Sequence, residues 1–347
     1  MSVDRWVRDR LPTPSVHLDV AACGRVSTAV LDAQVAHLRA EAGLGGYVAE
    51  DAAATQLAGA RRALSGLLCG ADVAWSEGAG AAFVTLLQAW PLPPRSRVGT
   101  VGSEYAPNAY VLRRQAALRG WDVVQLPVDD LGRVTDVPAG LDLLALPQIA
   151  SQRGIVQPDL SGCGIPVVLD VAQSLGQTPV PTGCAAYVGT SRKWLCGPRG
   201  IGFLAVDPAY ELDLPVAPLP GATGAAHLDV HEAHVAGRVG LAVALDEWTP
   251  ELLPVVHGIA AQLRTQLSDL PGWTVVEPVD EPTGITTLVG GDPAPLRARL
   301  LAEGFITTPV PTTRSADMDR PALRISTAAW VTPDDVERLR TALGSAA

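Results

Sequence analysis

The sequence predicts an α/β fold, in which a mostly parallel sheet carries helices on both faces and a smaller α+β unit follows. Short apolar, β-branched runs alternate with longer helical patterns up to residue 206, and these runs are almost continuously apolar. At 347 residues the chain exceeds the usual size of one domain. We expect a large domain over 14–248 and a small C-terminal domain over 249–347, with 1–13 packing near the small one.

Seven apolar runs predict the strands of the large sheet, at 73–76, 97–101, 122–128, 141–146, 166–171, 185–189 and 202–206. Helical patterns lie at 52–68, 80–89 and 107–119 and, after a Pro/Gly/Ala-rich loop over 207–225, at about 230–248. The C-terminal part predicts a helix from about 251, strands at 273–277, 284–289 and 322–326, and helices at 293–303 and 333–343. In sheets of this kind, ligands bind at the carboxyl ends of the strands.

The composition favours a protein with a sizeable core and no nucleic-acid or membrane partner. Hydrophobic residues make up 48% of the chain, and the formal net charge is −10, which disfavours binding to nucleic acid or to an anionic membrane. No leader pattern opens the chain and no apolar run is long enough to span a bilayer, so we expect a cytoplasmic protein. The five cysteines include no C-x-x-C, which argues against a disulfide framework or a zinc ribbon.

One lysine stands out in the segment TSRKWLCGPRG, residues 190–200. The 26 basic residues are 25 arginines and Lys193. Arginine cannot lose its proton and attack a carbonyl, whereas lysine can form a Schiff base once its pKa is lowered. The alternative is compositional drift that left one lysine by chance, and this residue alone does not decide between the two.

Two further segments place polar groups where strands end. The segment VAWSEGAGAAFVTLL, residues 73–87, predicts a strand, a Gly-rich turn and a helix, whose N-terminal N–H groups could bind a phosphate. The alternative is an ordinary strand-to-helix turn. In PVVLDVAQSLG, residues 166–176, Asp170 ends an apolar strand and Gln173 follows. Asp170 could instead be a helix N-cap.

In their order along the chain, these three segments resemble fold-type I enzymes that depend on pyridoxal 5'-phosphate (PLP). The similarity is to aminotransferase class V, which includes cysteine desulfurases, kynureninase and isopenicillin-epimerase-like proteins. SVHLDVAA at 15–22 resembles the start of that family, and LRISTAAWVTPDDVERL at 323–339 resembles its end. The resemblance covers nearly the whole chain and implies a seven-stranded, mostly parallel sheet and a homodimer.

The resemblance implies a role for each matching residue. Lys193 would form the Schiff base and move the proton at Cα, and Arg324 would bind the substrate α-carboxylate. Asp170 would pair with the pyridinium nitrogen, so that the ring acts as an electron sink. The other implied cofactor contacts are Gln173 at the ring oxygen, Tyr105 on the ring face, Thr190, Arg192 and the backbone of Ala79 and Gly80 at the phosphate, and His234 at the phosphate of a partner subunit.

The departures from the family pattern bear on the reaction. Tyr105 follows Glu104 where many relatives have Glu-His, Arg192 precedes the lysine where many have His, and Gly80 stands where Thr is usual. A cysteine desulfurase needs a nucleophilic cysteine before the carboxylate-binding arginine, but residues 304–324 contain none. A persulfide-forming desulfurase is therefore not expected, and Cys196 is expected to be a packed residue.

Within the group, the stretches at 45–47, 151–159 and 189–204 resemble the sulfoxide lyases of ergothioneine biosynthesis. This resemblance implies a C–S lyase that eliminates the sulfur of a cysteine S-conjugate sulfoxide and needs no catalytic cysteine. Tyr47 could offer an aromatic face to the trimethylammonium group of such a substrate.

Two alternatives stay open. The first is a PLP-dependent aminotransferase or epimerase of another amino acid. The second is a metal-dependent hydrolase, because HLDVHEAH places His227, His231 and His234 at i, i+4 and i+7, which would share one face if the segment were helical.

Overall fold

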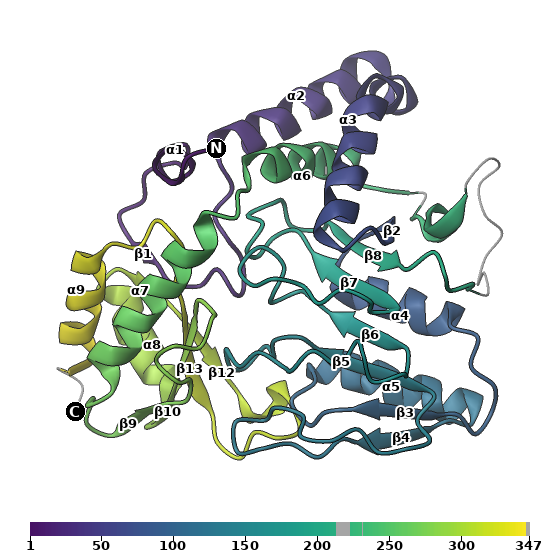
Figure 1. Cartoon of the computed structure of the whole chain (residues 1–347). Helices are drawn as coiled ribbons and strands as arrows, with labels where there is room; N and C mark the ends of the chain where they lie inside the picture. Colours follow the sequence, from purple (N-terminus) through teal and green to yellow (C-terminus); the bar gives the residue numbers. More distant parts are fainter. Residues whose placement is uncertain (213–222, 231, 345–347) are drawn as a thin grey trace.

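The centre of the protein is a seven-stranded sheet with the order β2-β8-β7-β6-β5-β3-β4 (Figure 1). The computed structural model describes residues 1–212, 223–230 and 232–344. The strands are β2 (Asp72–Ser76), β3 (Arg97–Thr100), β4 (Asp122–Gln125), β5 (Leu143–Pro147), β6 (Val167–Asp170), β7 (Ala186–Thr190) and β8 (Gly202–Val206). Pairing is parallel from β7 to β4, whereas β8 is antiparallel to both of its neighbours. The expected seven-stranded, mostly parallel α/β fold is thus confirmed.

Both faces of this sheet are buried, which explains why the strands are apolar throughout. Successive residues point to opposite faces: Val167 and Leu169 join one hydrophobic cluster, and Val168 joins another. One face is covered by α4 (Ala79–Ala89) and α5 (Ala106–Arg119). The other is covered by α3 (Gly46–Leu67) and α6 (Val235–Glu247), against which α2 (Thr28–Leu44) packs.

Several boundaries differ from those that the sequence predicts. The strand expected over 122–128 ends at Gln125, two residues before Pro127, which has no N–H to donate. The helix expected over 52–68 begins at Gly46, and α2 was not predicted at all. The helix expected over 230–248 begins only at Val235, and residue 231 lies outside the described residues. Residues 224–228 form a 3-10 turn, η1 (Gly224–Leu228).

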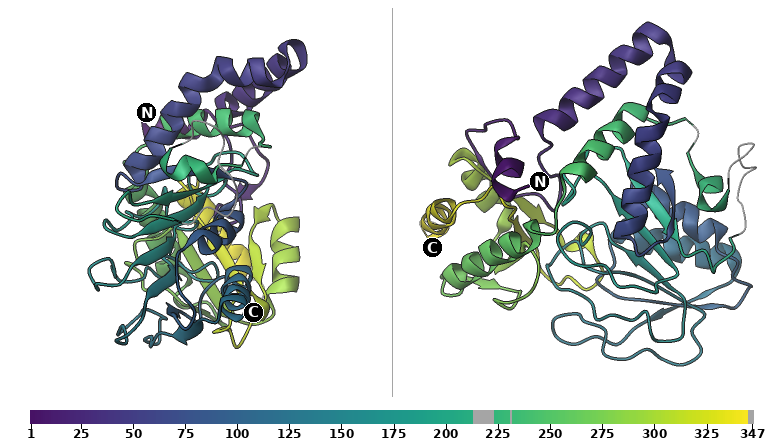
Figure 2. Two further views of the ribbon diagram at one scale, coloured as in Figure 1. Left: turned by 90° about the vertical axis from the view of Figure 1, so that its right-hand side faces the viewer. Right: turned by 45° about the horizontal axis from the view of Figure 1, so that its top comes forward.

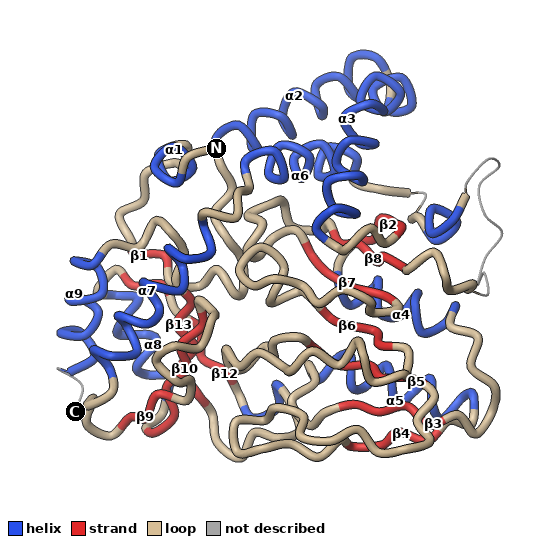
Figure 3. The backbone as a smooth tube through the Cα atoms, viewed as in Figure 1, coloured by secondary structure: helices blue, strands red, loops and turns tan. Residues whose placement is uncertain are grey.

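A second, antiparallel sheet with the order β12-β13-β10-β9 forms the C-terminal part. Its strands are β9 (Trp273–Val275), β10 (Ile285–Gly290), β12 (Thr308–Val310) and β13 (Ala322–Ser326), and its helices are α7 (Leu252–Leu267), α8 (Pro293–Ala302) and α9 (Pro333–Gly344). Figure 3 shows the strands of this sheet beside the helices α7, α8 and α9. The domain boundary at 248/249 remains a proposal, which the connection between α6 and α7 supports.

The N-terminal residues pack against this C-terminal part. The short strand β1 (Val16–His17) pairs in parallel with β11 (Phe305–Ile306), and the Ser326 N–H donates to the Leu18 carbonyl at 2.8 Å. In α1 (Val3–Arg8), the Trp6 ring stacks on the Trp330 ring with centroids 5.4 Å apart. In the right-hand view of Figure 2, the purple N-terminal helix lies beside the yellow-green C-terminal part. No described helix is long and apolar enough to cross a membrane.

Candidate active site

A cavity of about 670 Å³ lies where the carboxyl ends of the large sheet meet the C-terminal sheet. Asp170 ends β6, Thr190 ends β7, and Arg324 lies on β13. Nine of the residues that the sequence singles out line it: Ala79, Gly80, Tyr105, Asp170, Gln173, Thr190, Arg192, Lys193 and Arg324. Positions spread over almost 250 residues of sequence therefore come together at one site, at the sheet edge where the α/β rule predicts a ligand.

The backbone on both sides of Lys193 is held firmly. The Gly24 N–H donates to the Arg192 carbonyl at 2.7 Å, and the Cys196 N–H donates to the Lys193 carbonyl at 3.0 Å. A Cβ on Gly24 would lie 2.4 Å from that Lys193 carbonyl oxygen. Only glycine at position 24 lets the N-terminal segment approach so closely, and this approach fixes where the lysine side chain starts.

The cavity lowers the pKa of the Lys193 amine to about 7. Burial is the largest cause, because it disfavours the charged form, and the cations of Arg192, Arg324 and Arg314 add to it. The carboxylate of Asp170 acts in the opposite direction. A large share of the amine is therefore neutral near pH 7, as a nucleophile or a proton acceptor requires.

Asp170 is held by two hydrogen bonds at the end of β6. Its Oδ1 accepts from the Ala172 N–H at 2.8 Å, and its Oδ2 accepts from the Asn108 side-chain amide at 2.8 Å. Burial raises the pKa of this carboxyl, and the nearby Lys193 works against that rise. The Ala172 contact closes a local turn, and no helix begins between β6 and β7, so Asp170 is not a helix N-cap. Its carboxylate lines the cavity.

Asn108 links Asp170 to a second buried carboxyl, Glu104. The same amide nitrogen lies 3.2 Å from Glu104 Oε1, which also accepts from the Tyr105 N–H at 2.8 Å. Glu104 Oε2 is buried with no hydrogen-bond partner. Burial, followed by the charge of Asp170, raises the pKa of Glu104 to about 8. Sequence reasoning missed Asn108, because an asparagine in the first turn of a helix carries no distinctive signal.

The side chain of Gln173 is held at the cavity by two hydrogen bonds, one of them from Trp194. The Gln173 amide nitrogen donates to the Ala21 carbonyl at 3.0 Å, and its Oε1 accepts from the Trp194 indole N–H at 3.3 Å. Both contacts orient the amide, and one of its two N–H groups has no protein acceptor among these bonds. The side chain is therefore fixed at the edge of the cavity with a donor to spare.

The start of α4 leaves backbone N–H groups without partners. Gly78 precedes this helix and offers no side-chain cap, so the first N–H groups, from Ala79 onward, have no partner within the helix. A Cβ on Gly202 would lie 2.4 Å from the Gly78 Cα, so β8 can pass this turn only because residue 202 is glycine. Arg192 faces the same cavity, and its guanidinium donates to the Ala22 carbonyl.

Arg324 is a buried cation, 2% exposed, on the opposite wall. One guanidinium nitrogen donates to the Ser151 carbonyl at 2.6 Å, and the other lies 3.4 Å from Asp19 Oδ1. Its Nε is buried and has no partner. Burial lowers the pKa of Arg324 to about 10, against the attraction of Asp19, and the group remains a cation at neutral pH. A planar fork of this kind matches a carboxylate.

Two predicted site residues are not brought to the cavity by this chain. Tyr47 lies in the first turn of α3 and is 84% exposed. His234 is the N-cap residue of α6, and its ring packs at Gly237, where a Cβ would lie 2.5 Å from Nδ1. Their expected roles need a second subunit and stay predictions.

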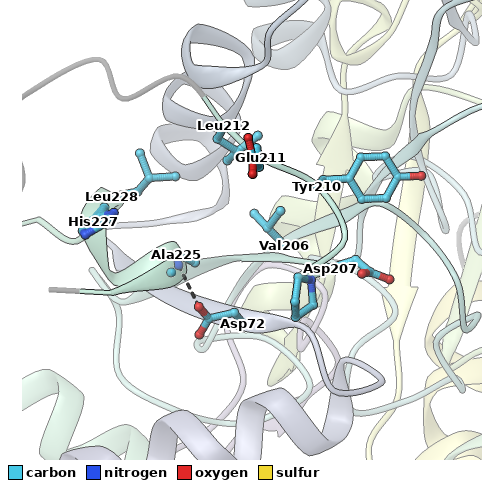
Figure 4. A pocket seen from close by; sticks show the side chains of 11 residues that line it. Asp72, Val206, Asp207, Tyr210, Glu211, Leu212, Ala225, His227 and Leu228 are labelled. Atoms are coloured by element: carbon cyan, nitrogen blue, oxygen red, sulfur yellow. Dashed lines mark hydrogen bonds between the residues drawn. The ribbon is translucent and has the colours of Figure 1, made fainter.

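The helix on which the metal-site alternative depends does not form where the structure describes the segment with the histidines. His227 belongs to the 3-10 turn η1 and His234 precedes α6, so no continuous helix joins them. His227 lines a separate pocket with Asp72 and Tyr210 (Figure 4). His231 lies outside the described residues. Among the residues described, no group of three or more His, Cys, Asp or Glu is arranged to hold a metal ion.

The cysteines do not offer a desulfurase nucleophile. Cys196 is 1% exposed, and burial raises the pKa of its thiol to about 11, so it is a packed residue as expected. Cys23 is the one cysteine among the residues described around the cavity, and burial raises the pKa of its thiol as well. The 304–324 segment reaches the cavity through Thr308, Arg314 and Arg324 instead.

Comparisons with known proteins agree with this geometry. The aminotransferase class-V family matches residues 16–239. The chain is 40% identical to the "probable hercynylcysteine sulfoxide lyase" of Mycobacterium tuberculosis, over 99% of this chain and 93% of that protein. It is 29% identical to isopenicillin N epimerase of Amycolatopsis lactamdurans, over 69% of this chain and 71% of that protein.

Solved structures show the same fold at low identity. A cysteine desulfurase from Thermococcus onnurineus superposes with a TM-score of 0.88 at 14% identity, covering 100% of this chain and 98% of that one. The cystine C–S lyase C-DES superposes with a TM-score of 0.85 at 16% identity, covering 96% and 98%. The family match and the 40% identical lyase relative make the protein a PLP-dependent carbon–sulfur lyase. The chain belongs to the aminotransferase class-V family.

Proposed function

We propose that this enzyme cleaves a cysteine S-conjugate sulfoxide by β-elimination, with hercynylcysteine sulfoxide as the substrate and pyruvate and ammonia as products. The observation that carries the proposal is the wall formed by 304–324, which presents arginines and a threonine but no thiol to the cavity. Cys23, the one thiol beside the cavity among the described residues, is not on this wall, and burial raises its pKa. The sulfur is therefore expected to leave without attack by a thiolate. A sulfoxide does this more readily than a thioether. The 40% identical relative carries the name of this reaction.

The donor set of the cavity fits PLP. Lys193 supplies an amine that is substantially neutral near pH 7, and the unpartnered N–H groups of Ala79 and Gly80, with Arg192 and Thr190, suit a phosphate. Asp170 supplies a carboxylate for a pyridinium nitrogen. When bound, PLP provides the electron sink that lets a Cα proton leave.

Each remaining step is assigned to residues of this chain. Arg324 binds the α-carboxylate of the substrate and fixes the orientation of Cα. Lys193, with its pKa near 7, takes the proton from Cα. Asp170, oriented by Asn108 and the Ala172 N–H, holds the negative charge that favours a protonated ring nitrogen. The C–S bond then breaks, and the sulfur leaves as a sulfenate that takes up a proton to give a sulfenic acid. Water hydrolyses the remaining three-carbon enamine to pyruvate and ammonia.

We also propose a homodimer in the cytoplasm. All five cysteines are free thiols, which suits a reducing compartment. Neither Tyr47 nor His234 reaches the cavity of its own chain, so both would act in a second subunit. Tyr47 would contact the trimethylammonium group of the substrate there, and His234 would contact the cofactor phosphate. Mixed oligomers of two inactive variants, K193A and H234A, test this. Activity recovered on mixing supports a shared site, and no recovery argues for sites built from one chain.

The activity test uses the PLP-loaded enzyme with hercynylcysteine sulfoxide and a thiol reductant, which converts the sulfenic acid product into ergothioneine. Pyruvate is followed by lactate dehydrogenase coupling, and ergothioneine by mass spectrometry. We expect both in equal amounts, with no need for an α-keto acid, much slower cleavage of the corresponding thioether, and no activity in K193A. Turnover that requires an α-keto acid would instead indicate an aminotransferase.

A further inference from the structure

The cavity concentrates positive charge in a protein whose formal net charge is −10. Four arginines line it, Arg192, Arg199, Arg314 and Arg324, and the amine of Lys193 is partly protonated beside them. The lining carboxylates are Asp19, Glu77 and Asp170. Such an excess of cations indicates a ligand set with several anionic groups.

The proposed chemistry accounts for most of these cations. Arg192 belongs to the phosphate cradle, Lys193 is the amine, and Arg324 meets the α-carboxylate. Arg199 is exposed at the rim. Arg314 has no anion assigned to it, although it stands in η2 (Thr312–Arg314), inside the segment that lines the cavity.

Arg314 is held over the cavity without a partner carboxylate. Its guanidinium carbon lies 5.6 Å from the centroid of the Tyr105 ring, and no ion pair to it occurs among the described residues. The acid that follows it, Asp317, is already engaged: it pairs with Arg153 and accepts from Ser315 Oγ at 2.7 Å and from the Gln152 amide at 3.1 Å.

The positive charge of Arg314 acts on two other residues of the cavity. It contributes to lowering the pKa of both Lys193 and Arg324. Its side chain is half-buried, so a bound anion would be partly shielded from water and would interact strongly with it. Arg314 therefore lines the cavity on the same segment as Arg324, near enough to Lys193 and Arg324 to affect the pKa of both.

We propose that Arg314 binds a second carboxylate, carried by the leaving group of the substrate, and so selects S-conjugates that are anionic at both ends. This inference rests on the proposed function and names the substrate class of the same site. The hercynyl group, a trimethylated histidine, carries such a carboxylate. Arg324 would then bind the carboxylate at the cysteine end of the substrate, and Arg314 would bind the carboxylate of the leaving group.

A matched pair of substrates tests this: hercynylcysteine sulfoxide, and the analogue in which hydrogen replaces the hercynyl carboxylate. We expect the wild-type enzyme to prefer the full substrate by about 10- to 100-fold in kcat/KM, mainly through KM, as a charge-assisted contact implies. R314Q should have a similar kcat/KM for the two substrates, and R314K should recover part of the wild-type preference. R320Q is the matched control, since Arg320 lies in the same segment but its side chain is 60% exposed.

The possible outcomes separate cleanly. If R314Q lowers kcat/KM equally for both substrates, Arg314 serves the amino-acid head or the cofactor, and the inference fails. It also fails if R314Q keeps the wild-type preference, or if the PLP affinity of R314Q differs from that of R320Q. If wild-type enzyme cleaves neither sulfoxide, the proposed function fails instead. Binding of hercynine to the holoenzyme then tests Arg314 without turnover. Hercynine should bind to wild type and to R320Q but not to R314Q. Equal binding to all three proteins would overturn the inference.

Discussion

Replacing Glu104 by glutamine should stabilise the enzyme increasingly as the pH rises. Glu104 is 1% exposed, and burial with the charge of Asp170 raises the pKa of its carboxyl from 4.5 to about 8. Between these values the folded protein holds a proton that the unfolded chain has released. The stability that this proton contributes is complete below pH 4.5 and is lost as the pH rises through 8.

The magnitude follows from the shift. One pKa unit corresponds to about 1.4 kcal/mol, so from pH 5 to pH 7 the titration of Glu104 lowers the free energy of unfolding by at most about 3 kcal/mol. With an unfolding entropy of about 2.1 cal/mol/K per residue, a chain of 347 residues would lose about 4 °C in melting temperature. Glutamine cannot titrate, and its oxygen can still accept from Tyr105 and Asn108.

The assay is the melting temperature of wild type and E104Q at pH 5, 6 and 7, with the same PLP concentration throughout. Titrating groups that do not interact with Glu104 cancel in the difference between the two proteins. That difference should move in favour of E104Q by up to about 4 °C over this range. E337Q, at an exposed position of α9, should show no such trend. A difference between E104Q and wild type that stays constant with pH would refute a raised pKa for Glu104.

Three further substitutions test other parts of the account. D170N should lower kcat by about 100-fold or more at saturating PLP, as loss of a buried electrostatic partner does; near-wild-type kcat would contradict its role. G202A should weaken PLP binding at least about tenfold in an absorbance titration, because its Cβ would collide with Gly78. The control G258A should leave the PLP affinity unchanged, because a Cβ there meets nothing within 4 Å. R264M should destabilise the fold by about 3–5 kcal/mol in urea unfolding, because the buried guanidinium donates to five backbone carbonyls and one hydroxyl around 278–285; unchanged unfolding would contradict this.

The strands were predictable because each is an apolar run that only a doubly covered sheet can bury. The strands at 202–206 and 322–326 have the expected bounds, and every residue in both is buried. Helix α2 was missed for the opposite reason. Only Val30 and His37 are buried along its 17 residues, so no apolar stripe marks it in the sequence.

The site was predictable where its residues sit at strand ends in a recognisable order, as Asp170 and Lys193 do. It was not predictable where a contact depends on packing between distant segments. Asn108 meets Asp170 across 62 positions of sequence, and the fit of Gly24 against Lys193 needs the N-terminal segment to cross the sheet edge. Arg314 belongs to a short irregular segment, where no periodicity indicates which way a side chain points.

The most direct test of the central claim is borohydride reduction of the PLP-loaded enzyme, followed by peptide mass mapping. Lys193 is the only lysine, so the one other primary amine of the chain is its N-terminus. The account predicts irreversible bleaching of the cofactor colour and a pyridoxyl adduct on the peptide that contains Lys193, absent from K193A. A colourless protein that takes up no PLP, or an adduct confined to the N-terminus, would contradict it.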